Sequence, residues 1–200
     1  MKILLLDNHD SFTWNLVELL RCLGKVNVNI CSSEMFRISD LAAYDRVIFS
    51  PGPGLPEEHQ VMFDILQEVE NLWKDEGRLI SVFGVCLGMQ AIAQFFGGKL
   101  FNLEHVVHGQ PRELRIIRSG HPLFHGITGS PTVGLYHSWA VDRDSLPESL
   151  EVLALSEDGM IMALAHKILP VCGVQFHQES IMTTDGKQMM SNWLNSDPTP

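Results

Sequence analysis

The 200-residue sequence has few positively charged side chains and no long apolar run. Its 14 Lys and Arg stand against 24 Asp and Glu, which gives a formal net charge of −10. A field of this sign repels phosphate backbones and anionic lipid surfaces, so nucleic acid is an unfavourable partner. No apolar run reaches the roughly 18 residues that cross a bilayer, and we therefore expect no membrane association.

Cysteine is also scarce, and its spacing argues against a disulfide framework. The four cysteines are far apart and form no C-x-x-C pair; they are Cys22, Cys31, Cys86 and Cys172. Small secreted domains carry cysteines at much higher density. The apolar run 3–6 is too short for the core of a signal peptide and meets Asp7 at once. These features predict free thiols and a cytoplasmic location.

Length and composition favour a single domain that covers residues 1–200. With 45% hydrophobic residues, a chain of this size can bury roughly 70% of its unfolded surface around one core. Short apolar runs alternate with helical apolar stripes, a pattern typical of an α/β protein with an open, mostly parallel sheet flanked by helices. The expected strands are 2–6, 26–30, 46–49, 79–83 and 171–176, and the expected helices are 14–23, 61–73, one from about 89, and 186–194.

The pattern changes between about Glu104 and Val174. Apolar runs shorten there and Gly, Pro and Ser interrupt them, which predicts a small extension of antiparallel strands and hairpins. His121 and His125 have the spacing of two ligands on one helix face, but Pro122 separates them. We interpret this stretch as a solvated loop and predict no metal site.

Residues 84–88, Gly-Val-Cys-Leu-Gly, have the spacing of a nucleophile elbow with Cys86 as the nucleophile. In such a turn the nucleophile has a strained backbone, and the flanking glycines have no Cβ that could clash with the strand and helix. The positive end of the following helix favours thiolate over thiol, and the Leu87 N–H is free to face an oxyanion. A buried structural cysteine in a glycine-rich turn is the alternative.

A cysteine nucleophile needs a base and a group that orients the base. His177 and Glu179 follow the last expected strand. Residues two apart in an extended chain point to the same side, so both can face the elbow while Gln178 faces away. Alone, a His-x-Glu pair is more often a surface pair. Together with the elbow, it favours a catalytic dyad.

The loop 50–56, Ser-Pro-Gly-Pro-Gly-Leu-Pro, is a third candidate element. Its prolines fix φ and its glycines allow close approach, so backbone N–H groups of a stiff loop can face a ligand. A plain turn is the alternative interpretation. Parallel α/β sheets bind ligands at the carboxyl ends of their strands, where this loop, the elbow and the His177 strand are expected to meet.

These segments together resemble class I glutamine amidotransferases of the Cys-His-Glu type, over essentially the whole chain. The resemblance runs through residues 50–56, 84–93, 136–139 and 173–180. The opening string 7–15, Asp-Asn-His-Asp-Ser-Phe-Thr-Trp-Asn, further resembles the small subunits of anthranilate synthase and aminodeoxychorismate synthase. The resemblance implies a flavodoxin-like α/β fold and delivery of ammonia to a chorismate-binding large subunit, in a heterodimer or heterotetramer.

Position by position, the resemblance implies a role for each matching residue. Cys86 would be the nucleophile, His177 the general base and acid, and Glu179 its orienting partner. The oxyanion would be bound by the N–H groups of Gly54 and Leu87. No cofactor is implied for this chain, and a magnesium ion is expected in the partner subunit. Recognition of L-glutamine would involve Gly52, Pro53, Gly54, Gln90, Ser138 and Trp139.

Three positions depart from the family pattern. Met89 stands where His is usual, Gln178 where Pro is usual, and Trp139 where Leu is common. The loss of proline adds backbone freedom between His177 and Glu179, which affects the fine geometry of the dyad. The larger Trp139 is expected to reshape the rim of the pocket.

Two aromatic residues near the first helix are not explained by this chemistry. Phe12 and Trp14 are expected to pack in the core, with a partner-facing patch as the alternative. The sequence therefore leaves their contribution to function open.

Three other functions are the alternatives. An amidotransferase serving the GMP or imidazole glycerol phosphate pathway would not need the string 7–15. A non-catalytic regulatory subunit would not need Cys86, His177 and Glu179 intact. A flavodoxin-like nucleotide binder would carry a glycine-rich loop with Lys, whereas the first loop here holds Asp7 and Asp10. Whether the final product is anthranilate or 4-amino-4-deoxychorismate stays open.

Overall fold

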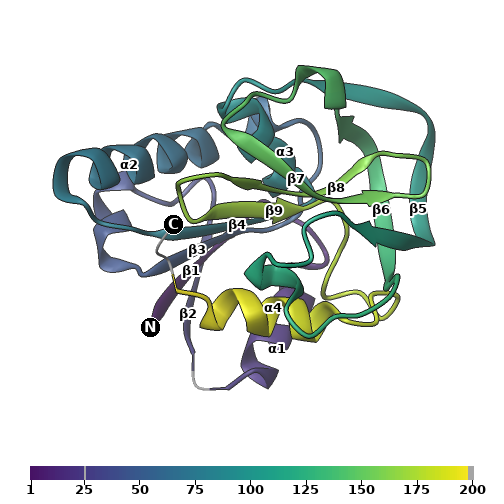
Figure 1. Cartoon of the computed structure of the whole chain (residues 1–200). Coiled ribbons are helices and arrows are strands. Elements are labelled where there is room, and N and C mark those ends of the chain that lie inside the picture. The colour runs from purple at the N-terminus through teal and green to yellow at the C-terminus, as the bar shows by residue number, and fades with distance from the viewer. Residues whose placement is uncertain (25, 198–200) are drawn as a thin grey trace.

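The computed structural model describes residues 1–24 and 26–197, which fold around a nine-stranded mixed sheet (Figure 1). The strand order is β2-β1-β3-β4-β9-β8-β7-β5-β6. Neighbours from β2 to β9 are parallel, and those from β9 to β6 are antiparallel. The predicted α/β class, with its antiparallel extension, is confirmed. The strands are β1 (Lys2–Asp7), β2 (Asn27–Ser32), β3 (Arg46–Phe49), β4 (Ser81–Val85), β5 (Leu100–Ile116), β6 (Thr132–Val141), β7 (Leu150–Ser156), β8 (Ile161–His166) and β9 (Val171–Val174).

Helices cover both faces of the parallel part of the sheet, as Figure 1 shows. The helices are α1 (Thr13–Cys22), α2 (Gln60–Glu76), α3 (Leu87–Phe95) and α4 (Gly186–Asn195). Side chains of β1 alternate between these faces: Ile3 and Leu5 pack with α1 and α4, whereas Leu4 and Leu6 pack with α2 and α3. All four are fully buried. A strand covered on both faces needs such a continuous apolar run, which is why the pattern was visible in the sequence.

The predicted elements are present with small shifts at their ends. β3 has the predicted bounds, whereas β4 begins two residues later than predicted. Gly77 ends α2 with a φ of 64°, a left-handed conformation that glycine adopts without strain. β9 stops at Val174 rather than Phe176, and an isolated bridge between His177 and Gly134 follows.

The antiparallel extension folds back onto the segment that follows β9. β5 pairs with β6 over most of its length and with β7 near its end, and register shifts interrupt the β5–β6 ladder. In β6, the Gly134 carbonyl accepts the His177 N–H at 3.1 Å. This contact fixes the segment after β9 against β6, so the extension forms a wall beside His177.

The prediction of a solvated loop at His121 is wrong. Residues Pro122–Phe124 form a short 3-10 helix, and the His121 ring nitrogen Nδ1 accepts the Leu123 N–H at 3.2 Å. Burial is the main cause that lowers the pKa of His121. His125 is exposed. Over residues 1–24 and 26–197, no group of three His, Cys, Asp or Glu side chains could hold a metal ion.

The helices of residues 1–24 and 26–197 offer no candidate for a membrane span. Within the part of the chain that the structure describes, none is both long enough and apolar enough to cross a bilayer.

Candidate active site

Cys86 lies in a strained turn between β4 and α3. Its φ of 53° and ψ of −102° are rare for a residue with a side chain. A Cβ added to Gly84 would lie 2.4 Å from the carbonyl carbon of Gly88, and one added to Gly88 would lie 2.7 Å from Phe49 Cβ. Strand, turn and helix approach so closely that only glycine fits on both sides. The elbow geometry predicted from the sequence is present.

This packing predicts a large stability cost for Gly84→Ala. The added methyl group would meet the backbone, which cannot rotate away, so we expect a loss near 3 kcal/mol, the upper part of the usual overpacking range. For a domain of this size, the melting temperature should fall by roughly 6 to 12 °C. Gly120→Ala is the matched control, since nothing lies within 4 Å of its added Cβ. Equal melting temperatures for the two variants would contradict the close-packed elbow.

The start of α3 presents free backbone donors beside the thiol. The first hydrogen bond of the helix runs from the Gln90 N–H to the Cys86 carbonyl at 3.1 Å. The N–H groups of Leu87 and Gly88 come before it and have no partner within the helix. Together with the helix dipole, they favour negative charge on or next to the Cys86 sulfur.

His177 and Glu179 face each other in a buried pair. His177 Nδ1 lies 2.7 Å from Glu179 Oε1, and both side chains are almost completely buried. Burial by itself lowers the pKa of His177, but Cys86 and Glu179 outweigh it and raise this pKa to about 10. Among the described residues, His177 Nε2 has no hydrogen-bond partner. Glu179 therefore orients the ring, and Nε2 is the atom left to exchange a proton.

Backbone contacts hold His177 in position, although Gln178 stands where proline is usual in the family. The Thr183 hydroxyl donates to the His177 carbonyl and accepts the Gly134 N–H at 3.0 Å. Gln178 points into the protein, is 2% exposed, and its amide has no hydrogen-bond partner in the described chain. A Cβ on Gly186 would collide with the Gln178 carbonyl. Close packing thus restricts the backbone freedom that was expected from having Gln178 in place of proline.

Two aromatic rings form a wall beside the dyad. Phe12 and Tyr136 each lie with ring centroids 4.9 Å from that of His177, and 4.8 Å from each other. Phe12 is therefore partly buried at the site rather than in the core. Trp14 is 63% exposed, so its predicted core position is also wrong. α1 buries Thr13, Leu16, Val17 and Leu20, a face that leaves Trp14 towards solvent.

The 50–56 loop reaches the elbow at one end. A Cβ on Gly52 would lie 2.7 Å from the Leu87 side chain, so this glycine allows close contact. Pro53 and Gly54 lie at an exposed tip, where the Glu58 carboxylate is 2.7 Å from the position of a Gly54 Cβ. The structure brings Gly52 to the elbow. The oxyanion role of the Gly54 N–H remains a prediction.

Gln90 connects the elbow to β6. It is 3% exposed, and its Nε2 donates to the Trp139 carbonyl at 2.8 Å and to Gln175 Oε1 at 3.1 Å. Trp139 is thereby joined to the site through its backbone. Ser138, next to it on β6, is partly buried. Sequence reasoning missed Gln175, although it lies two residues before His177 in an extended segment and so faces the same side.

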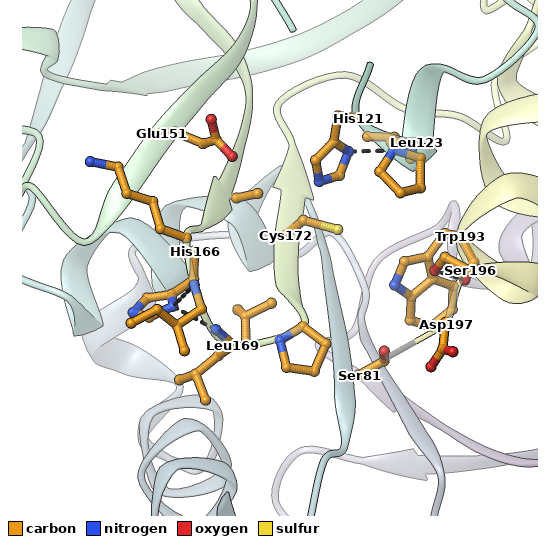
Figure 2. Close-up of a pocket in the computed structure, with 16 residues that line it drawn as sticks. Ser81, His121, Leu123, Glu151, His166, Leu169, Cys172, Trp193, Ser196 and Asp197 are labelled. Atoms are coloured by element: carbon orange, nitrogen blue, oxygen red, sulfur yellow. Dashed lines mark hydrogen bonds between the residues drawn. The ribbon is translucent and has the colours of Figure 1, made fainter. Parts of the chain in front are cut away.

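A cavity of about 230 Å³ lies where β4 and β9 begin, whereas the elbow follows the end of β4 (Figure 2). None of the predicted site residues lines it. It contains the buried Cys172, and this burial raises the pKa of the thiol to about 12 despite the nearby Arg46. Cys172 is therefore a neutral thiol at ordinary pH and not an activated nucleophile.

The chain belongs to the class I glutamine amidotransferase family, whose model matches residues 4–196. The predicted family is thereby confirmed. The fold is also found in a Thermoplasma acidophilum protein whose crystal structure is provisionally described as that of a GMP synthase subunit. The TM-score is 0.81 at 26% sequence identity, covering 97% of this chain and 92% of that one.

Curated relatives narrow the similarity within this family. A Haemophilus influenzae protein provisionally named anthranilate synthase component II is 42% identical over 199 residues, covering 100% of this chain and 98% of its own. Aminodeoxychorismate synthase component 2 of Escherichia coli is 39% identical over 195 residues, covering 96% and 99%. A Bacillus subtilis component 2 named for both synthases is 38% identical over 199 residues, covering 97% and 96%.

Proposed function

We propose that this chain hydrolyses L-glutamine through a thioester on Cys86 and delivers the ammonia to a chorismate-binding synthase subunit. One observation carries the glutaminase proposal: the buried His177–Glu179 pair, with its 2.7 Å contact, lies beside a cysteine elbow. The names of the relatives support chorismate as the acceptor, and leave anthranilate and 4-amino-4-deoxychorismate as the two candidate products.

The proposed reaction has two covalent steps. The Cys86 thiolate forms a bond to the side-chain carbonyl carbon of glutamine, and the C–N bond then breaks as His177 Nε2 protonates the leaving ammonia. A γ-glutamyl thioester remains. His177 then takes a proton from water, the resulting hydroxide attacks the thioester, and the C–S bond breaks to release glutamate. Cys86 returns to thiolate and His177 to imidazolium.

Each tetrahedral intermediate carries an oxyanion that needs donors. We assign this role to the N–H groups of Leu87 and Gly54, each worth roughly 3 kcal/mol in comparable sites. Leu87 lies at the free start of α3. Gly54 lies at the exposed tip of the 50–56 loop, beside Glu58. We further assign glutamine binding to Gly52, Pro53, Gly54, Gln90, Ser138 and Trp139.

The chorismate-binding subunit would dock over the carboxyl edge of the sheet. Three exposed apolar side chains follow strands that end at this edge: Trp14 after β1, Met35 after β2 and Ile181 after β9. Their exposed fractions are 63%, 75% and 98%. Trp14 lies close in sequence to Phe12, which packs on His177. A partner seated there could sense the dyad and receive ammonia before it is protonated.

The proposed chemistry uses a thiolate, an imidazole and a carboxylate, and therefore assigns no cofactor to this chain. Magnesium would belong to the partner subunit of the heteromer. We place the protein in the cytoplasm, where a reducing environment keeps the Cys86 nucleophile and the exposed Cys22 as thiols.

The decisive experiment is a product assay with the natural partner. The protein would be purified with the chorismate-binding subunit of its source organism and supplied with chorismate, glutamine and magnesium. Anthranilate or 4-amino-4-deoxychorismate is the expected product. If glutamate formed without either product, the glutaminase proposal would stand and chorismate amination would be overturned. If no glutamate formed, both proposals would be overturned.

A further inference from the structure

A buried amide points at the proposed nucleophile. Gln175 follows β9 directly and is 0% exposed. Its Nε2 donates towards Cys86 Sγ at 3.4 Å, a normal length for a hydrogen bond to the larger sulfur atom. A neutral thiol is a weak acceptor, but a thiolate accepts a charge-assisted hydrogen bond, which is roughly twice as strong as a neutral one.

The direction of this amide is fixed by its neighbours. Gln175 Oε1 accepts from Gln90 Nε2 at 3.1 Å, and Gln90 Nε2 also donates to the Trp139 carbonyl at 2.8 Å. Because the Trp139 carbonyl can only accept a hydrogen bond, the Gln90 side chain must turn its Nε2 towards it. The same Nε2 needs an acceptor from Gln175, so Gln175 turns its oxygen to Gln90 and its nitrogen to Cys86. The Gln175 backbone N–H donates to the Met162 carbonyl at 2.8 Å, which anchors the segment.

We propose that Gln175 is a further catalytic residue, whose amide stabilises the Cys86 thiolate and holds Sγ in line for attack. The inference rests on the proposed glutaminase function. Gln90 orients Gln175, and the Trp139 carbonyl orients Gln90, so the chain of donors links β6 to the nucleophile. Both of these Gln90 contacts use its Nε2 atom.

The test is the pH dependence of thiol alkylation in the full chain. Cys86 would be alkylated with iodoacetamide across a pH series, and the modified peptide quantified by mass spectrometry. Gln175→Leu removes the donor, so the midpoint of the pH–rate profile should rise by about one pH unit, a tenfold change in thiolate population. Exposed Cys22 serves as an internal control and should not change. Gln188→Leu, on the exposed face of α4, is the matched substitution control.

Gln175→Glu is the second variant, because it keeps the side-chain volume in case Gln175→Leu fails to fold. A carboxylate beside the sulfur should raise the midpoint further than leucine does. Glutaminase kcat with the partner should fall roughly 10- to 100-fold in either variant, with a smaller change in KM. Wild-type alkylation profiles in both variants would overturn the inference.

The two proposals can fail separately. Alkylation needs neither glutamine nor a partner. If the Gln175 variants shifted the alkylation profile but the protein had no glutaminase activity, the role of Gln175 at the thiolate would stand and the proposed glutaminase function would be overturned. An active glutaminase whose Gln175 variants keep both the wild-type profile and the wild-type kcat would retain the function and overturn the role of Gln175.

Discussion

Cys86→Ser is expected to abolish glutamine-dependent amination by the assembled synthase and to leave ammonium-dependent amination unchanged. The serine hydroxyl is a far weaker nucleophile than a thiolate at the start of α3, so the glutamine-dependent rate should fall by a factor on the order of 10³ or more. Under the proposed function, the partner subunit carries out amination itself and needs only free ammonia. Product formation would be measured with glutamine and, separately, with ammonium chloride at alkaline pH.

The control for this experiment is Cys22→Ser, since Cys22 is an exposed cysteine on the outer part of α1. This variant should retain both activities. Cys86→Ser could instead lose ammonium-dependent amination to the same degree as the glutamine-dependent reaction. The proposed assignment of glutamine hydrolysis to this chain and of amination to the partner would then be wrong.

Glu179→Gln is expected to lower kcat for glutamine hydrolysis by up to roughly 10⁴-fold, the loss found when the carboxylate of a serine-protease triad becomes an amide. The carboxylate accepts from His177 Nδ1 at 2.7 Å and is completely buried. An amide can offer a donor in its place and turn the imidazole to the wrong tautomer. Steady-state glutamate release by the assembled synthase would measure the effect. Glu148→Gln, at an exposed position, is the control and should be fully active.

The pH dependence of stability gives this variant a second readout. The pKa of His177 is raised from 6.5 to about 10 by Cys86 and Glu179, against the effect of burial. The folded protein therefore holds a proton that the unfolded chain releases. The resulting stabilisation is fully present below about pH 6.5 and is lost as the pH rises towards 10. In Glu179→Gln, the free energy of unfolding should fall less over this window. The free energy of unfolding would be measured by urea denaturation at several pH values. The same pH dependence in the variant and in the wild type would contradict the role of Glu179.

Much of the fold was visible in the sequence because its signals are local. The run at residues 3–6 predicted a strand buried on both faces, and the structure packs alternate side chains of that run against opposite helix pairs. Gly84 and Gly88 predicted a turn too close for any Cβ. The spacing of His177 and Glu179 predicted two side chains on one side of an extended segment, and these now lie in contact.

The sequence alone therefore determined the parallel sheet, the elbow and the dyad, since each depends on periodicity or on a requirement for glycine. Tertiary structure alone decided which distant residues surround them. Phe12 and Tyr136 reach the His177 ring from the loop after β1 and from β6, and Thr183 fixes the His177 backbone. Gln175 meets Cys86 across 89 positions of sequence. Such contacts arise from the pairing of strands remote in the chain, for which a single sequence carries no local signal.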